Sequence, residues 1–444
     1  MCRNSGERSG LKLKEIENGM RLLVDESPAR RPNSPSGSNQ RQPILPRAAP
    51  DRLAVIVGLW FVPVSIAVSE FFLSIALLAR VVKLARRQAQ LHLPRCFWFW
   101  LLWVGLAFVA WTFSPEPALG SSEIRHMLLL GALFVTLPVL ATADRRTVWK
   151  GIFLASSLSS LILIGEFVWR LFYYRREIGA GGDVGFYLRS GGLLHHWMVY
   201  ATVEILVVAG LLSFWSVYCE HRLRWWPVAA INGVAVVLSL TRMAWVTCLL
   251  LLGMDLVWHR SKWIWALPMV PLIVYLLAPS AVRLRVADSI NPTYYSNSER
   301  LQMVRVGWQM VRDHPLVGVG PGRIDKLYAS YLTPQDLVPA YHGHLHNNIA
   351  QIAAQFGIPV TLAAVLFAGI LFRDLLKARK AATNPDDRFV AQTALLALTG
   401  FVFAGFFEYT YGHSLALILL SFAVLSALFP AVPDRHEVRR ALGD

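Results

Sequence analysis

Residues 342–357 read HGHLHNNIAQIAAQFG, and this stretch joins a long polar segment to a long apolar one. Three histidines alternate with other residues at its start. Ile349 and Ile352 then recur at helical spacing, which predicts a helix that begins at His346 or Asn347. Imidazole and amide groups at the mouth of an apolar helix call for either a functional or a capping explanation.

The composition of the whole chain is that of a membrane protein. Of the 444 residues, 55% are hydrophobic and only 16% are charged, which exceeds what a water-soluble surface tolerates. We therefore expect an all-α polytopic membrane protein with about twelve transmembrane helices. Their approximate bounds are 53–67, 69–85, 96–113, 124–142, 149–170, 194–217, 226–240, 243–258, 263–279, 347–372, 390–408 and 412–430.

The chain divides by composition into three parts. Residues 1–52 are polar, basic and rich in Ser, Pro and Arg, which is typical of a disordered tail. Residues 53–430 form the predicted transmembrane domain, and residues 431–444 form a second tail. The four cysteines have no metal-like spacing, and none is expected to form a disulfide; they are Cys2, Cys96, Cys219 and Cys248.

The distribution of basic residues predicts the orientation. With both tails in the cytoplasm, most of the 43 Lys and Arg residues fall on the cytoplasmic side, as the positive-inside rule requires. The basic residues left outside are all Arg except Lys326. Because an Arg fork holds phosphate or carboxylate bidentately, an anionic partner is indicated. Alternatively, these arginines contact lipid headgroups or pair with the acidic residues of the same face, Asp183, Asp288, Glu299, Asp313, Asp325 and Asp336.

The largest outer loop spans residues 280–346. An amphipathic helix is predicted from Ser298, capped by Asn297 or Ser298 and ended by the Pro/Gly cluster of residues 314–322. Its apolar face is Leu301, Val304, Trp308 and Val311. A second short helix is predicted over 323–331.

His346 is the candidate catalytic residue. The positive end of a helix dipole disfavours an imidazolium there, and a neutral imidazole suits a general base. The alternative is a polar capping cluster without chemistry. A metal site made of His342, His344 and His346 is not expected, because the spacing is unlike zinc motifs and no carboxylate is adjacent in sequence.

Other polar residues lie in or near the predicted spans. Arg242 falls between two short spans, where it faces either a cavity or the headgroups; the break there is inferred from the polar residues 239–242. Glu408 flanks the outer end of the eleventh span and either orients a ligand or sits in the interface. Three acids inside spans are expected to make interhelical hydrogen bonds; they are Glu166, Glu204 and Asp255.

Four motifs in this order resemble the bacterial O-antigen ligase family, within the group that includes O-antigen polymerases and O-oligosaccharyltransferases. They are Arg189-Ser-Gly-Gly, Leu240-Thr-Arg242 followed by Trp245, the segment Glu299-Arg300…Trp308…His314-Pro-Leu-Val-Gly-Val-Gly-Pro-Gly322, and His346-Asn-Asn-Ile-Ala-Gln-Ile-Ala-Ala-Gln-Phe-Gly357. The resemblance covers roughly residues 50–430. The pair His195-His196 departs from the polar pair expected after the first motif.

The resemblance implies a bacterial inner-membrane glycosyltransferase with its active site on the periplasmic face. Such an enzyme moves a preassembled glycan from undecaprenyl pyrophosphate to the lipid A–core oligosaccharide of lipopolysaccharide. The transfer inverts the anomeric centre and uses neither ATP nor metal, so no cofactor is expected. The sequence agrees, since it has no phosphate-binding loop, serine nucleophile elbow or His-Glu-x-x-His motif. The expected partners are the two lipid-linked substrates and membrane lipids, and not nucleic acid.

The expected roles can be assigned to single residues. His346 accepts the proton of the acceptor hydroxyl, while Arg189, Arg242 and Arg300 bind the pyrophosphate. Four residues form a second tier of candidates; they are Arg305, Arg323, Asn347 and Glu408. Two alternatives stay open: a polymerase or O-oligosaccharyltransferase of the same group, and a transporter of a lipid-linked sugar, which the placement of the cations on one face disfavours.

Overall fold

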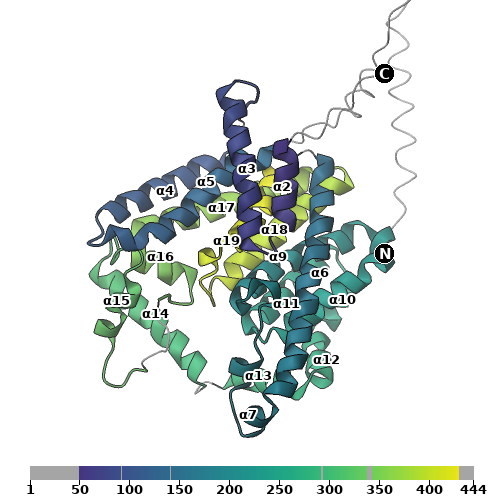
Figure 1. Cartoon of the computed structure of the whole chain (residues 1–444), viewed down its shortest axis with the longest axis vertical. Coiled ribbons are helices and arrows are strands. Elements are labelled where there is room, and N and C mark those ends of the chain that lie inside the picture. The colour runs from purple at the N-terminus through teal and green to yellow at the C-terminus, as the bar shows by residue number, and fades with distance from the viewer. Residues whose placement is uncertain (1–49, 92, 141, 292–293, 338–342, 430–444) are drawn as a thin grey trace, which may run out of the picture. The chain divides into compact units, whose positions relative to one another are not determined.

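The computed structural model describes residues 50–429 except 92, 141, 292–293 and 338–342, and these residues form helices and turns without a β-strand (Figure 1). Residues 1–49 and 431–444 of the two predicted tails, and His342, lie outside the described residues. Residues 50–52, predicted as part of the disordered tail, are helical instead. The α-helices are α2 (Pro50–Trp60), α3 (Ile66–Ala85), α4 (Cys96–Thr112), α5 (Ser121–Thr136), α6 (Thr142–Tyr173), α7 (Arg175–Gly179), α8 (Val184–Leu188), α9 (Trp197–Val217), α10 (Arg222–Leu238), α11 (Arg242–Trp258), α12 (Met269–Leu277), α13 (Ser280–Ile290), α14 (Tyr295–Asp313), α15 (Ile324–Leu327), α16 (Asn348–Phe356), α17 (Ile358–Ala381), α18 (Pro385–Ala404) and α19 (Ser414–Leu428).

Short 3₁₀ segments link several of these helices. They are η1 (Pro117–Gly120), η2 (Leu137–Val139), η3 (Gly192–Leu194), η4 (Cys219–His221), η5 (Lys262–Ala266), η6 (Tyr328–Tyr331) and η7 (Thr410–Gly412).

Five helical segments of the described chain are long and apolar enough to cross a membrane. They are Pro117–Val139, Asp144–Tyr173, Trp197–Val217, Ile358–Ala381 and Pro385–Ala404, and the apolar helices α4 and α19 are shorter. The all-helical membrane character is thus confirmed, while the number of twelve spans stays a prediction.

Three predicted spans are wrong as single helices. The span 53–67 covers the end of α2, a turn at residues 61–64 and the start of α3. Residues 263–279 form η5 and then α12, whose nine residues measure about 14 Å at ~1.5 Å per residue, short of the ~30 Å hydrocarbon layer. Pro268 stands at the junction. The predicted span 347–372 is split at Gly357 into α16 and α17, because this glycine adopts φ +85°, which no helix continues through.

The core lies where α9, α18 and α19 pack together in the middle of the helices (Figure 1). Trp149 of α6 is fully buried there, with ring centroids 5.7 Å from Phe153 and 5.4 Å from Phe422 of α19. The three acids in the spans accept hydrogen bonds, two of them across helices as expected, whereas the partner of Glu166 lies in the loop after α8. Glu204 accepts a hydrogen bond from Ser156 at 2.6 Å, Asp255 accepts one from Gln392 at 2.6 Å, and Glu166 accepts one from Ser190.

The break between α10 and α11 falls at residues 239–241, as the polar residues there predicted. Leu240 takes φ +54° at this point. Because α10 ends before this turn, Arg242 is the first residue of α11 and lies at the end of the bundle where α9 begins. The turn at residues 239–241 thus places the Arg242 side chain at one end of the helices without a long loop.

The long loop contains the predicted amphipathic helix, with two corrections. The helix α14 begins at Tyr295, and neither Asn297 nor Ser298 caps it, because both lie inside its first turn. Three of the four residues of the predicted apolar face point outward, since Leu301 is 75%, Val304 40% and Trp308 67% exposed. The fourth, Val311, is buried as predicted. The opposite face packs on α16 and its approach, through a cluster that includes Met303, Val306, Met310, Leu345 and Ala354. The predicted second helix is present as α15 and η6.

Glycines let the end of this loop pass close to the junction of α16 and α17. Val319 and Gly320 donate backbone hydrogen bonds to Ala354 and Gln355 at 2.8 and 3.1 Å. A Cβ on Gly357 would come within 2.4 Å of the Leu316 carbonyl oxygen. Only glycine fits at this position. The junction at Gly357 therefore determines the direction of α16 relative to α17.

Replacing Gly357 by Ala should therefore destabilise the protein. Its backbone, at φ 85° and ψ 175°, lies in a region that is essentially restricted to glycine, and such strain costs about 1–3 kcal/mol. We expect a lower midpoint of thermal unfolding in detergent. Gly233→Ala in α10 is the matched control, because a Cβ there meets open space and alanine favours a helix. Equal midpoints for the two variants would contradict the assignment.

Candidate active site

The start of α16 is tied down by two neighbouring asparagines. Asn347 caps the helix by accepting a hydrogen bond from Ala350 N at 3.0 Å, and it donates one to Phe406 O at 3.1 Å. Asn348 donates from its amide to Thr410 Oγ1 at 2.8 Å. Both therefore bind the helix to the loop between α18 and α19. The predicted helix start is confirmed, and Asn347, a second-tier candidate, has a structural partner for both side-chain groups.

This connection brings Glu408 to two histidines that lie more than sixty residues away in sequence. The Glu408 carboxylate is 1% exposed. Its Oε2 lies 2.8 Å from His346 Nδ1, and its Oε1 lies 3.1 Å from His344 Nε2. The backbone N–H of Tyr409 donates to Oε1 as well, at 3.1 Å. A buried carboxylate thus has donors on both oxygens.

The electrostatics of Glu408 follow from these contacts. Burial alone would raise the pKa of its carboxyl, but the hydrogen bonds from His344 and His346 outweigh burial and hold that pKa well below its usual range. Glu408 is therefore ionised at neutral pH and accepts the Nδ1–H of His346. In that tautomer the Nε2 of His346 carries the free lone pair.

Arg300 lies between this histidine–carboxylate group and a cluster of other arginines. Its Nη2 lies 3.9 Å from Glu408 Oε2, and its side chain is 26% exposed. Glu299, next to it on α14, is close enough to His346 for their charges to interact, and burial raises the pKa of its carboxyl. The first turns of α14 thus line the same site as the start of α16.

Three more arginines gather beside Arg300. Burial, together with the charges of Arg285 and Arg300, lowers the pKa of Arg189 to about 10, which leaves it protonated at neutral pH. Arg189 and Arg285 both reach the same glycine: a Cβ on Gly185 would lie 3.3 Å from Nη2 of the first and from Nη1 of the second. Arg242 joins them, with hydrogen bonds at 3.4 Å to Asp288 O and Ser296 Oγ.

These guanidinium groups have few acidic partners. The Nε atoms of Arg189 and Arg285 are buried, and neither has a hydrogen-bond partner among the described residues. Arg189 stacks over Trp197, with Cζ 5.6 Å from the ring centroid, while Arg285 bonds Tyr294 Oη at 2.8 Å and lies 3.7 Å from Asp288. A cluster of cations that retains unused donors is suited to a multiply charged anion such as a diphosphate.

The other two candidate arginines are already paired. Arg305 forms a 2.5 Å ion pair with Asp336 of the same loop. Arg323 contacts Glu116 at 3.3 Å and donates to Val319 O at 2.8 Å. Arg305 and Arg323 thus pair with acidic residues, which is the alternative explanation for arginines on this face. That explanation holds for these two and not for the whole set.

Two further imidazoles near the site are neutral. Burial lowers the pKa of His196, whose Nδ1 accepts a hydrogen bond from Met198 N at 3.2 Å. Burial lowers the pKa of His413 to about 4, and its ring contacts Thr202 Oγ1 at 3.2 Å. The charge that an anion meets at neutral pH therefore comes chiefly from the arginines.

Sequence reasoning missed Arg285 and ranked Glu408 too low. Arg285 lies in a short helix with no motif around it, and nothing local separates it from Arg283. Glu408 had one signal, its position at the outer end of an apolar run, but its pairing with His346 depends on the tertiary fold. His342 lies outside the described residues.

The same group of side chains could also hold a metal ion. The ligand atoms of His344, His346 and Glu408 all lie within 4.8 Å of one another, and two histidines with one carboxylate occur in catalytic zinc sites. The argument against a metal rested partly on the lack of an adjacent carboxylate in the sequence, and Glu408 supplies one in space. The metal-free site therefore stays a prediction that needs a direct test.

Comparison with protein families gives a match over residues 227–365, to the family described as O-Antigen ligase. The match runs from α10 into α17 and includes Arg242, Arg285, Arg300 and His346. Arg189 and Glu408 lie outside it. No curated protein matches the chain. The resemblance drawn from the sequence motifs is confirmed by this match.

The arginine cluster should bind inorganic pyrophosphate, and Arg285→Gln should weaken that binding about tenfold or more. A hydrogen bond to a charged group contributes roughly 1.5–3 kcal/mol, and about 1.4 kcal/mol corresponds to tenfold in affinity. Calorimetry on the purified protein measures both. Arg305→Gln is the matched control, because Asp336 already occupies that guanidinium. Equal effects of the two variants, with melting midpoints unchanged, would rule out a specific cluster.

Proposed function

We propose, on the basis of the match of residues 227–365 to the O-antigen ligase family, that this protein transfers a preassembled glycan from undecaprenyl pyrophosphate to the lipid A–core oligosaccharide. The family match supports ligase-type or polymerase-type glycosyl transfer in general. The observation that carries the specific mechanism is the buried Glu408, which orients His346 next to a set of arginines with unused donors.

His346 acts as the general base. Its Nδ1–H is directed to Glu408 at 2.8 Å, so Nε2 is the atom that accepts a proton. The acceptor sugar hydroxyl gives its proton to Nε2 while its oxygen attacks the anomeric carbon of the donor. Base assistance of this kind typically adds ~10²–10⁴-fold to a rate. The ionised Glu408 stabilises the imidazolium that forms, as the carboxylate does in a Ser-His-Asp triad.

The arginines act on the leaving group. As the new bond from the acceptor oxygen to the anomeric carbon forms, the bond from that carbon to the pyrophosphate oxygen breaks, and its electron pair stays on the pyrophosphate. Arg189, Arg242 and Arg300, with Arg285 added by its position in the cluster, bind the oxygens on which this negative charge grows. Donors placed at developing charge are worth about 2.7–4 kcal/mol each. Attack from the face opposite the leaving group inverts the anomeric centre.

The periplasmic placement of this site is supported by the way the helices run. α18 is 20 residues long and separates Asp386 at its start from Glu408 beyond its end, a distance of about 30 Å at ~1.5 Å per residue. The far end is rich in basic residues: Arg146 pairs with Asp386 at 3.3 Å, and α17 ends with Arg379 and Lys380. By the positive-inside rule that end is cytoplasmic, so His346 lies on the opposite face of the bacterial inner membrane.

The reaction itself is tested by reconstitution of the purified protein with an undecaprenyl-pyrophosphate-linked glycan and a separate lipid A–core acceptor. We expect transfer to lipid A–core, seen as a shift of the acceptor on gels and in mass spectra. Growth of the glycan on its own carrier, without transfer, would assign the protein as a polymerase instead. A chelator should leave the rate unchanged, and a loss of activity restored by added metal would show that the site of His344, His346 and Glu408 holds an ion.

His346→Ala should reduce transfer by ~10²–10⁴-fold without weakening pyrophosphate binding, because the base and the anion site are different groups. Glu408→Gln should also slow transfer, since it removes the charge that stabilises the imidazolium. Rates and donor binding are measured on the same preparations. His221→Ala is the matched control, because that imidazole in η4 is 48% exposed and lies near Glu220, not Glu408. Wild-type turnover in His346→Ala would overturn the base assignment.

A further inference from the structure

A cavity of about 290 Å³ lies between α3, α5 and the first residue of α19, apart from the candidate active site. Glu70, Arg125 and His126 line it, and the side chains of Glu70 and Arg125 form no ion pair with another described residue. The His126 side chain is 8% exposed, and its Nδ1 has no hydrogen-bond partner among the described residues. Because buried polar groups nearly always have partners, these three side chains indicate a ligand.

The charged groups lie at one end of this cavity. Lys83 near the end of α3 pairs with Asp51 at 2.7 Å, and the next residue of α2, Arg52, contacts the first turn of α6 at 2.5 Å. The end of α3 and the segment that follows α5 therefore meet at one face of the bundle, so α3 and α5 run in the same direction. Glu70 and Arg125 are each the fifth residue of their helix, which places both near the opposite face.

The rest of the wall consists of leucine, alanine and a few hydroxyl side chains. Along α5 the lining residues extend from Arg125 to Thr136, about 16 Å at ~1.5 Å per residue, or roughly half of a ~30 Å hydrocarbon layer. Leu73 and Leu77 line the cavity from α3. Leu128 lines it as well and is 58% exposed, so the cavity opens on the apolar surface of the helices. A ligand that is charged at one end and hydrocarbon along one leaflet is a membrane lipid.

We propose that this cavity binds a phospholipid whose head group carries both an ammonium and a phosphate, such as phosphatidylethanolamine. Glu70 binds the ammonium, and Arg125 binds the phosphate, since a guanidinium holds two phosphate oxygens at once. His126 supplies a further hydrogen-bonding atom beside them. Phosphatidylglycerol and lipid A offer Arg125 a phosphate but bring no cation to Glu70, whose charge repels them. The carboxylate is thus the selective group.

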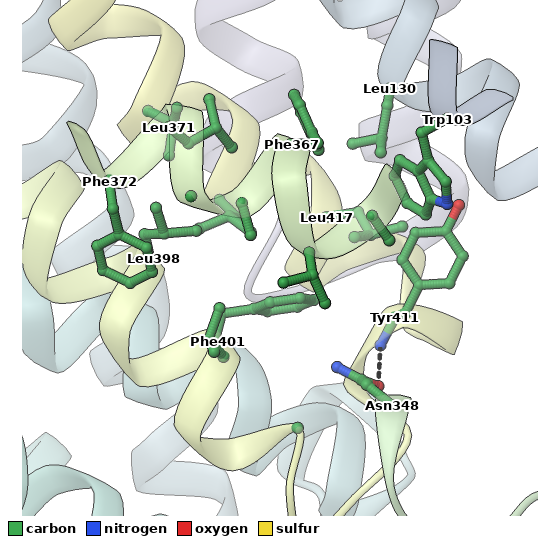
Figure 2. A pocket seen from close by; sticks show the side chains of 18 of the residues that line it. Trp103, Leu130, Asn348, Phe367, Leu371, Phe372, Leu398, Phe401, Tyr411 and Leu417 are labelled. Atoms are coloured by element: carbon green, nitrogen blue, oxygen red, sulfur yellow. Dashed lines mark hydrogen bonds between the residues drawn. The ribbon is translucent and has the colours of Figure 1, made fainter. Parts of the chain in front are cut away.

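The cavity shares α5 with the loop between α18 and α19. The His126 ring lies edge-on to Tyr411, with centroids 6.0 Å apart, and the N–H of Tyr411 donates to Asn348 Oδ1 at 3.2 Å (Figure 2). One turn earlier in α5, Glu123 accepts a hydrogen bond from Tyr409 Oη. A lipid bound in the cavity therefore holds α5 against the loop that positions the candidate active site, and it stabilises the folded protein without taking part in a reaction.

Photolabelling of the purified full-length protein in detergent tests the location and the selectivity. The probe is phosphatidylethanolamine with a diazirine in an acyl chain close to the glycerol, and we expect labelled peptides from α3 and α5 at lining positions such as Leu73 or Leu129. Unlabelled phosphatidylethanolamine should compete about tenfold better than phosphatidylglycerol or lipid A, the size expected for one hydrogen bond to a charged group. Equal competition by phosphatidylglycerol, stronger competition by lipid A, or no labelling of α3 and α5 would overturn the proposal.

Two variants separate the two halves of the head group. Glu70→Gln should weaken binding of phosphatidylethanolamine about tenfold and remove its preference over phosphatidylglycerol. Arg125→Gln should weaken both lipids by similar factors, because both carry a phosphate. Apparent affinities come from labelling and competition at increasing lipid concentration. A preference that persists in Glu70→Gln, or wild-type affinity in Arg125→Gln, would contradict the assigned contacts.

Glu177→Gln and Arg176→Gln in α7 are the matched controls, because both side chains are exposed and neither lines the cavity. Their labelling should equal that of the wild type. Thermal unfolding without added lipid shows whether each variant is folded. Added phosphatidylethanolamine should raise the midpoint for the wild type and the controls, and raise it less for Glu70→Gln, because a ligand stabilises the state that binds it. None of these measurements requires glycan transfer, so the lipid site and the proposed reaction are tested separately.

Discussion

The ionised carboxylate of Glu408, buried where helices of distant parts of the chain meet, is the interaction on which the site depends. It receives hydrogen bonds from His344, His346 and the Tyr409 backbone and lies 3.9 Å from Arg300. Removing one partner of a buried ion pair costs about 3–5 kcal/mol, because the remaining charge is left without compensation. The loop after α18, the approach to α16 and the first turns of α14 are therefore held in one arrangement by a single anion.

The arginine cluster has the opposite arrangement to Glu408, because it brings like charges together with few acidic partners. Burial and then the charges of Arg285 and Arg300 lower the pKa of both Arg189 and Arg242 to about 10, so these cations repel one another. Their approach is stabilised by contacts that carry no negative charge, such as the stacking of Arg189 on Trp197 and the bond from Arg285 to Tyr294. A diphosphate bound there, as proposed, would relieve this repulsion, and part of its binding energy would come from the close approach of the arginines.

Local patterns in the sequence were enough to predict the helical membrane fold, the break at residues 239–241 and the helix start at Asn347. Each depends on neighbours within a few residues. The split at Gly357 was missed because a glycine in an apolar run gives no sequence signal that its φ is positive. The outward direction of Leu301 and Trp308 was missed because periodicity defines an apolar face but does not say whether protein or lipid covers it. The pairing of Glu408 with His346 and the place of Arg285 are products of tertiary packing, beyond the reach of spacing alone.

The outward face of α14 has a consequence for regulation by the bilayer. This helix carries Arg300 in its second turn and rests on α16 by one side, while Leu301, Val304 and Trp308 point away from the protein. An apolar stripe of this kind is typical of an interfacial helix, which lies in the membrane surface with its apolar side toward the lipid. The depth of α14 would then follow the position of that surface. In the proposed reaction, membrane thickness and headgroup packing would then set the height at which Arg300 meets the pyrophosphate, and turnover would depend on the physical state of the lipid.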